Sequence, residues 1–284
     1  PLNVTIAADL AINTKLGGLI GYSGNSAINR CDVKAEINVS GGDSEENCNT
    51  YIGGLIADYT ETNTEENKVL EILNSNAHTE INVVELASNS LYISGGIGII
   101  SSTGIADVLK HSLFTGSIIC EKAETVEGTT TTTFTTANTV IAGGAFGLAN
   151  KIVKVSETMS TVDMIIGTDN SNEHSVKAGG FAGVVTGNGS VLTLNNVIST
   201  GKLVPICGAN ATMVHLGGLI GSVSDEASAE INNSYTLTSI ISDAINGNAL
   251  EETYSDVLVG YAKEIVGEDG NKTIRQKYNE NLKN

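Results

Sequence analysis

Apolar and polar residues alternate along this chain with a period of two, in short runs bounded by Gly, Asn, Ser and Asp. The clearest runs are residues 33–39 (VKAEINV) and 77–83 (AHTEINV), which are nearly the same segment twice. A period of two is typical of β-strands, whereas a helix repeats its apolar positions every three or four residues. The pattern therefore predicts an all-β protein.

A Gly-Gly doublet followed by small or apolar residues recurs six times. Successive doublets lie about 36 to about 48 residues apart, a spacing typical of solenoids and propellers. We expect each doublet to occupy the same place in its repeat, where glycine lets the backbone turn sharply or take a positive φ. The units start near Gly17-Gly18, Gly53-Gly54, Gly95-Gly96, Gly143-Gly144, Gly179-Gly180 and Gly217-Gly218, with a partial unit at Gly260.

Two columns of similar residues emerge when the alternating stretches of the six units are stacked. The first column is apolar throughout, so we expect it to face the core: Ile37, Ile81, Ile118, Met164, Leu203 and Ile240. The second lies just upstream and holds small or compact residues, which suit a tight corner: Cys31, Ser75, Ser112, Thr158, Val197 and Ser234.

A unit of roughly 36 to 40 residues holds about three strands with their turns, which is the content of one coil of a parallel β-helix. The competing repeat fold is a propeller, whose blades usually carry periodic aromatic motifs. This chain has no Trp and only 4% aromatic residues. We therefore predict a right-handed parallel β-helix, or solenoid, of about six coils over residues 1–260. Residues 261–284 would form a polar C-terminal cap, tail or linker.

The repeat resembles the GLUG-motif family, in which a Gly-Gly-Leu-Ile/Val-Gly strand alternates with an Asn-Cys/Ser-Tyr and Thr-Gly segment. The best matches are residues 17–21 with 29–31 and residues 217–221 with 232–236, while Thr115-Gly116 and Thr200-Gly201 match the Thr-Gly part. The resemblance covers about residues 15–245. It implies a secreted or surface-attached protein, because such repeats occur there, including as non-catalytic parts of surface peptidases.

The net charge of −17 argues against nucleic acid or an anionic membrane as a partner. No run of about 18 apolar residues is present, so we expect no membrane insertion. The chain opens on Pro1 without a signal peptide, which suggests a mature or excised fragment. Acidic loops such as Asp225-Glu226 leave calcium open as a ligand, but no calcium-binding motif occurs and we expect no cofactor.

Four cysteines and several asparagines call for a structural interpretation. Cys31 and Cys48 fall in one unit and could form a disulfide, but buried thiols are the preferred interpretation, and no paired cluster suggests zinc. Asparagine at one aligned position predicts a partial hydrogen-bonded ladder of Asn29, Asn195 and Asn232. Six Asn-x-Ser/Thr sequons permit glycosylation, at Asn3, Asn38, Asn188, Asn210, Asn232 and Asn271.

The Thr-rich segment at residues 129–136 lies in a longer gap than the equivalent ones and reads as an insertion. A strand extension, a mobile loop and a partner-binding loop are the three interpretations that the sequence leaves open.

Catalysis has little support in the sequence. The four histidines, His78, His111, His174 and His215, fall at scattered positions, and no catalytic motif occurs. We therefore predict a non-catalytic extracellular structural or adhesive domain that binds other protein surfaces, copies of itself through the coil ends, or glycans. The alternatives are a self-assembling filament subunit joined end to end by strand stacking, and a carbohydrate-active β-helix enzyme.

Overall fold

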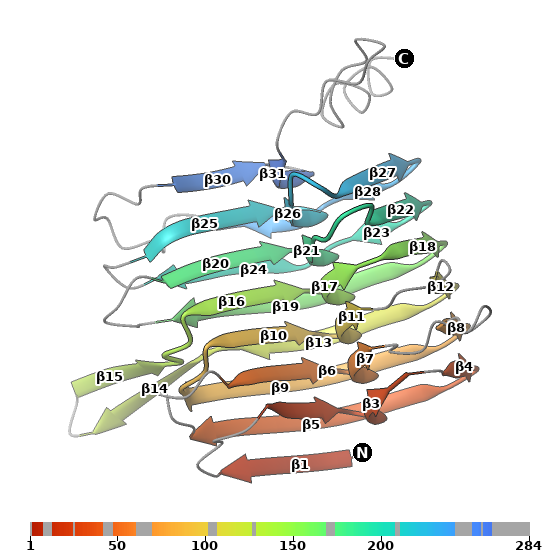
Figure 1. Ribbon diagram of the computed structural model, residues 1–284. Helices are drawn as coiled ribbons and strands as arrows, with labels where there is room; N and C mark the ends of the chain where they lie inside the picture. Colours follow the sequence, from red (N-terminus) through yellow and green to blue (C-terminus); the bar gives the residue numbers. More distant parts are fainter. Residues whose placement is uncertain are drawn as a thin grey trace.

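A computed structural model describes residues 2–7, 13–24, 26–41, 48–60, 70–101, 107–126, 129–168, 174–207, 211–241, 252–256 and 258–262. These residues form strands and turns that wind into a parallel β-helix (Figure 1). Six coils each contribute to four parallel sheets, which we name A to D, so a coil holds four strands rather than the predicted three. In Figure 1 the chain runs along sheet B in front and returns behind along sheet A while rising, which is right-handed winding.

Sheet A contains the longest strands and the predicted core column. In order it consists of β1 (Leu2–Ala7), β5 (Asp32–Gly41), β9 (Asn76–Leu86), β13 (Leu113–Ile119), β19 (Met159–Thr168), β23 (Ile198–Ser199) and β28 (Tyr235–Thr236), with β24 (Lys202–Cys207) and β29 (Ser239–Ile240) continuing the last two rungs.

Sheets B and C follow one another in each coil and meet at the Gly-Gly corner. Sheet B consists of β2 (Thr14–Gly17), β6 (Asn49–Gly53), β10 (Ser90–Ser94), β16 (Thr139–Gly143), β20 (His174–Gly179), β25 (Ala211–Gly217) and β30 (Glu252–Asp256). Sheet C consists of β3 (Ile20–Ser23), β7 (Ile56–Thr60), β11 (Ile97–Ser101), β17 (Phe146–Asn150), β21 (Ala182–Val185), β26 (Ile220–Val223) and β31 (Val259–Ala262).

Sheet D closes each coil before the chain returns to sheet A. It consists of β4 (Ala27–Asn29), β8 (Glu71–Leu73), β12 (Asp107–Lys110), β18 (Ile152–Ser156), β22 (Val191–Asn195) and β27 (Ser228–Asn232). At the C-terminal end β31 reaches Ala262, two residues past the predicted domain limit, and residues 263–284 lie outside the described part.

The six residues of the predicted core column are successive cross-strand partners in sheet A, from Ile37 through to Ile240. The first five are at most 1% exposed, and Ile240, in the last coil, is partly buried against the same core. Parallel strands pair identical positions of successive coils, so one apolar position per repeat becomes a continuous apolar stack.

The Gly-Gly doublets lie at the corner between sheets B and C, but two details of the predicted alignment are wrong. The register pairs Ser94, not Gly95, with Gly53 and Gly143, so the third doublet lies one position late. Gly260 aligns with Gly221, the end of the motif, and does not begin a unit. The glycine column common to all six coils is the second position of the corner: Gly18, Gly54, Gly95, Gly144, Gly180 and Gly218.

These corner glycines are needed because backbones approach closely, not because of a positive φ, which none of them has. A Cβ on Gly54 would lie 1.9 Å from the Gly95 carbonyl oxygen of the next coil, and one on Gly144 would lie 2.2 Å from that of Gly180. Real Cβ atoms do not approach carbonyl oxygens so closely. The corner therefore stacks backbone directly on backbone, which only glycine permits.

The left-handed conformation appears instead at the corner between sheets D and A. One residue per coil has a φ near +50° there, and none is glycine: Arg30, Asn74, His111, Glu157, Asn196 and Asn233. The next residue is the predicted small one. Its hydroxyl, where it has one, donates back across the corner, as when Ser75 Oγ donates to the Leu73 carbonyl oxygen at 2.8 Å. The same bond occurs at Ser112, Thr158 and Ser234.

The Thr-rich insertion is a strand extension. The strands β14 (Glu121–Val126) and β15 (Thr129–Phe134) form an antiparallel hairpin that projects from the solenoid (Figure 1). The predicted insertion extends too far, because Thr135 and Thr136 already belong to the coil. Thr135 is fully buried and donates through Oγ1 to the Gly167 carbonyl oxygen at 2.9 Å, and the Thr136 amide bonds to Leu86.

Candidate functional site

The outward side chains of sheets B and C meet across the glycine corner and form a concave strip along the solenoid. We call this strip the outer groove, and its apolar part consists of Tyr51, Tyr92 and Ile141 from sheet B with Ile99, Leu148 and Val184 from sheet C. Ile141, Leu148 and Val184 are only 6%, 8% and 6% exposed although they lie outside the core cluster. The sharp corner brings the two outward columns together, so they bury each other.

A pair of stacked tyrosines marks the groove in coils two and three. The rings of Tyr51 and Tyr92 are cross-strand neighbours on β6 and β10, with centroids 5.0 Å apart and planes 7° from parallel. Their edges, rather than their faces, are directed away from the sheet, because each ring lies against the next along the solenoid axis. This part of the groove therefore offers apolar edges and phenol groups to a partner.

An ion pair lies at the N-terminal end of the groove. Lys15 Nζ lies 2.7 Å from Asp58 Oδ2 and 4.1 Å from the ring centroid of Tyr22. Asp58 is only 5% exposed, and a buried charge needs a partner. Lys15 and a hydrogen bond from Thr60 Oγ1 compensate its charge. This cluster is neutral overall and limits the apolar strip at that end.

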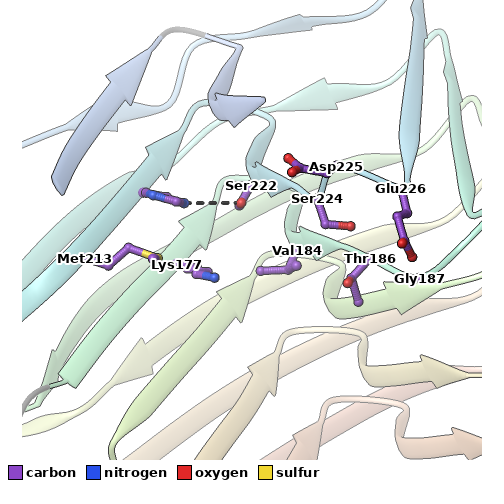
Figure 2. Close-up of a pocket in the computed structure, with 10 residues that line it drawn as sticks. Lys177, Val184, Thr186, Gly187, Met213, Ser222, Ser224, Asp225 and Glu226 are labelled. Atoms are coloured by element: carbon purple, nitrogen blue, oxygen red, sulfur yellow. Dashed lines mark hydrogen bonds between the residues drawn. The ribbon is translucent and has the colours of Figure 1, made fainter. Parts of the chain in front are cut away.

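The opposite end of the groove opens into a hollow of about 490 Å³. We call it the C-terminal hollow. Figure 2 shows Lys177 and Met213 on the sheet B side and Ser222 and Ser224 on the sheet C side, with Val184 shared with the outer groove. The residues that line the hollow are Lys177, Val184, Thr186, Gly187, Met213, His215, Ser222, Ser224, Asp225 and Glu226.

The floor of the hollow holds a hydrogen-bonded histidine and serine. His215 Nδ1 lies 3.2 Å from Ser222 Oγ, and the two residues are 2% and 4% exposed. Burial, reinforced by the nearby charge of Lys177, lowers the pKa of His215 from 6.5 to about 4. The imidazole is therefore neutral at physiological pH, and the floor carries no charge there.

The loops that follow β21 and β26 form the remaining wall. Backbone bonds to the preceding coil hold both loops, from Thr186 to the Ala149 carbonyl and from Ser224 to the Val185 carbonyl, each at 2.9 Å. Ser224 Oγ is buried and has no hydrogen-bond partner among the described residues. Asp225 and Glu226 are exposed at the rim. The wall thus presents one unsatisfied hydroxyl inside and two carboxylates outside.

The other histidines lie elsewhere. His78 is exposed on sheet A, where Nδ1 contacts Thr115 Oγ1 at 2.9 Å and Nε2 lies 3.7 Å from Glu80. His111 pairs with Glu157 at the left-handed corner, and His174 is buried at the start of β20. The structure brings none of these three to the C-terminal hollow.

The three asparagines of the predicted partial ladder do share one register position, but only two of them are neighbours. Asn232 Nδ2 donates to Asn195 Oδ1 at 3.1 Å, as expected. Asn29 lies in coil one and pairs in register with Leu73. The ladder is interrupted because the positions between the two ends are Leu73, Lys110 and Ser156, which have no amide side chain.

All four cysteines are free thiols: Cys31 is partly buried, and Cys48, Cys120 and Cys207 are buried. Burial raises the pKa of Cys120 and of Cys207 to about 12, so neither is a reactive thiolate at neutral pH.

Within the described ranges no cluster of three or more His, Cys, Asp or Glu side chains is arranged to hold a metal ion. Two acidic segments, residues 42–47 and 61–69, lie outside those ranges. The described residues also contain no helix long and apolar enough to cross a membrane.

Comparison with known proteins finds no matching family, no matching curated protein and no matching solved structure.

Proposed function

We propose that the chain is a non-catalytic structural and adhesive repeat domain of a secreted or cell-surface protein, akin to the GLUG-motif proteins. The single observation that carries the proposal is the outer groove, a concave apolar strip that crosses several coils on the outside of a rigid scaffold. Ile141, Leu148 and Val184 are nearly buried, whereas Tyr51, Tyr92 and Ile99 are half-buried and keep apolar surface accessible along the strip. The concave surfaces of solenoids are commonly used for binding.

Bead retention under flow tests the adhesive role. Beads that carry the chain would be passed over surfaces coated with mucin, as a glycan-rich surface, or with collagen, as a protein surface. We expect retention on at least one surface and a several-fold loss with Tyr92→Ser, which removes half of the tyrosine stack. Tyr235→Ser is the matched control, because Tyr235 is 46% exposed on sheet A, away from the groove.

Two results would count against the proposal. Beads with the unmodified chain that are retained no better than bare beads on both surfaces would refute adhesion. Equal losses with Tyr92→Ser and Tyr235→Ser would mean that the outer groove is not the binding surface.

A carbohydrate-active or other hydrolytic enzyme is a weaker alternative, for which His215 and Ser222 are the only adjacent candidate base and nucleophile in the described hollow. A general base works best with a pKa near the operating pH, and the pKa of His215 is about 4. Ser222 is also 4% exposed, which leaves its oxygen poorly accessible. A hydrolytic activity on polysaccharide or ester substrates that Ser222→Ala abolished would nevertheless establish the enzyme.

A filament subunit is the second candidate, favoured by exposed apolar residues at both ends of the solenoid. Of the five large apolar side chains that are exposed among the described residues, Leu19 and Tyr22 lie in the first coil and Tyr235 and Leu237 in the last. Head-to-tail stacking of open strand edges would extend without closure. Concentration-dependent growth in analytical sedimentation that Leu237→Lys abolishes, while Ile152→Lys on the side of the solenoid does not, would support the filament.

A further inference from the structure

The C-terminal hollow has the size and shape of a ligand site. Its volume of about 490 Å³ lies within the range of about 300 to 1,000 Å³ typical of small-molecule pockets. Four strands and two loops that are tied by backbone bonds to neighbouring coils form its walls, so the cavity exists before any ligand binds.

The charges around the hollow are mixed in sign, so an ion of either sign would be attracted by one part of the lining and repelled by another. An anion would meet Asp225 and Glu226 at the rim, on a chain whose net charge is −17. A cation would meet Lys177, which is the residue paired in register with His215 on the adjacent strand. A neutral ligand avoids both repulsions and can still bond to each charged group.

The floor and inner wall require groups that both donate and accept hydrogen bonds. Ser222, Ser224 and Thr186 carry hydroxyls, and the Ser224 hydroxyl is buried without a hydrogen-bond partner in the described structure. A buried hydroxyl is stabilised when it gains such a partner. Ligand hydroxyl groups can donate to the rim carboxylates, accept from Lys177 Nζ, and do either with the three hydroxyl side chains.

Apolar side chains complete the lining. Met213 and Val184 lie on opposite sides of the hollow, on sheets B and C, and offer aliphatic surface between the polar groups (Figure 2). The C–H faces of a pyranose ring are apolar whereas its edge carries hydroxyls, so a sugar matches both parts of the lining.

We propose that the C-terminal hollow is a binding site for a neutral sugar residue of a glycan. The proposal rests on the adhesive function inferred above and names its ligand class. Val184 belongs to both the hollow and the outer groove, so a longer glycan would continue from the hollow along the groove toward Leu148.

Ligand-observed saturation-transfer NMR on the full chain tests the site. The neutral probes are the methyl glycosides of glucose, mannose and galactose, and the charged probes are glucuronate and glucosamine. We expect at least one neutral glycoside to bind, and its affinity to fall about tenfold or more in Lys177→Met through the loss of a charged donor. Lys154→Met is the matched control, since Lys154 is exposed on sheet D outside the hollow.

Ser224→Ala provides a second variant that leaves the fold intact, because the Ser224 side chain makes no hydrogen bond in the described structure. It should also weaken binding, with an unchanged melting temperature. Binding of none of the neutral glycosides, binding of only glucuronate or only glucosamine, or neutral binding that both variants leave unchanged would each overturn the proposal.

The two proposals fail separately. Beads retained through the outer groove without any glycoside binding would keep the adhesive function and remove the sugar site. Glycoside binding without bead retention would keep the sugar site and remove the adhesive function.

Discussion

Replacing Ile81 by alanine removes three carbon atoms from the centre of the core column. Ile81 is fully buried and lies between its cross-strand partners Ile37 and Ile118. The transfer of three carbons at about 0.8 kcal/mol each gives about 2.4 kcal/mol. A residual cavity adds to this, so the expected total is about 3 to 5 kcal/mol. The partners cannot move inward to fill the space, since the strand hydrogen bonds fix the spacing between coils.

Asn82→Ala is the matched control one position along the same strand. Asn82 is half-buried on the outer side, and its Nδ2 donates to Asn38 Oδ1 at 2.8 Å. The loss of that one bond should cost about 0.5 to 1.5 kcal/mol. The ratio of the two effects therefore tests which face of the strand is directed to the core.

Urea titrations monitored by far-UV circular dichroism and by tyrosine fluorescence would measure both changes. Coincident transitions with an unchanged slope would show that the midpoint reports stability. Equal losses from Ile81→Ala and Asn82→Ala would refute the assignment of the core face, and a larger loss from Asn82→Ala would reverse it.

Three further predictions follow from the corner, the hairpin and the hollow. Gly144→Ala should destabilise the fold by about 1 to 3 kcal/mol through overpacking, measured in a thermal melt. Gly24→Ala should not, because its Cβ would lie 3.4 Å from the nearest atom, the Thr60 carbonyl oxygen. Similar melting temperatures for the two variants would contradict the close approach of backbones at Gly144. Replacing residues 123–132 by Asn-Gly should leave the melting temperature nearly unchanged, because a two-residue turn closes the shortened hairpin, and global unfolding would show that the hairpin supports the coil. The free energy of unfolding should fall by up to about 3 kcal/mol as pH falls from 6.5 to 4, because His215 takes up a proton in the unfolded protein but stays neutral in the folded one until the pH nears its folded pKa of about 4. In pH-dependent urea titrations His215→Gln should reduce this loss and His111→Gln should not. Equal pH dependence of the parent and His215→Gln would contradict the prediction.

The repeats could be read from the sequence because a parallel solenoid makes each position of a coil equivalent to the same position in the next. Each coil buries its apolar residues only against its neighbours, so the requirement for Ile81 at the core is repeated locally at Ile37 and Ile118. A period of two and a recurring apolar position are therefore enough to predict the strands, their parallel stacking and the core column. The same logic located the small residues at the corner between sheets D and A.

The left-handed residues of that corner could not be predicted. Arg30, His111 and Glu157 differ from Asn74 in size and charge and share with it only polarity, and each has a φ near +50° because the coil must close at that point. The third glycine doublet was misplaced for a related reason. A doublet such as Gly95-Gly96 is recognisable by letters alone, but only strand register shows that Ser94 occupies the first corner position.

The outer groove and the C-terminal hollow were decided by tertiary structure alone. In the sequence, the residues that line them are ordinary outward positions of alternating strands, separated by tens of residues, such as Tyr92, Leu148, Lys177 and His215. They become a concave surface because glycine allows sheets B and C to meet at a sharp corner, which brings their outward columns into contact. Periodicity specifies which face of a strand is buried, but the angle between two sheets depends on backbone packing between coils that no single repeat contains.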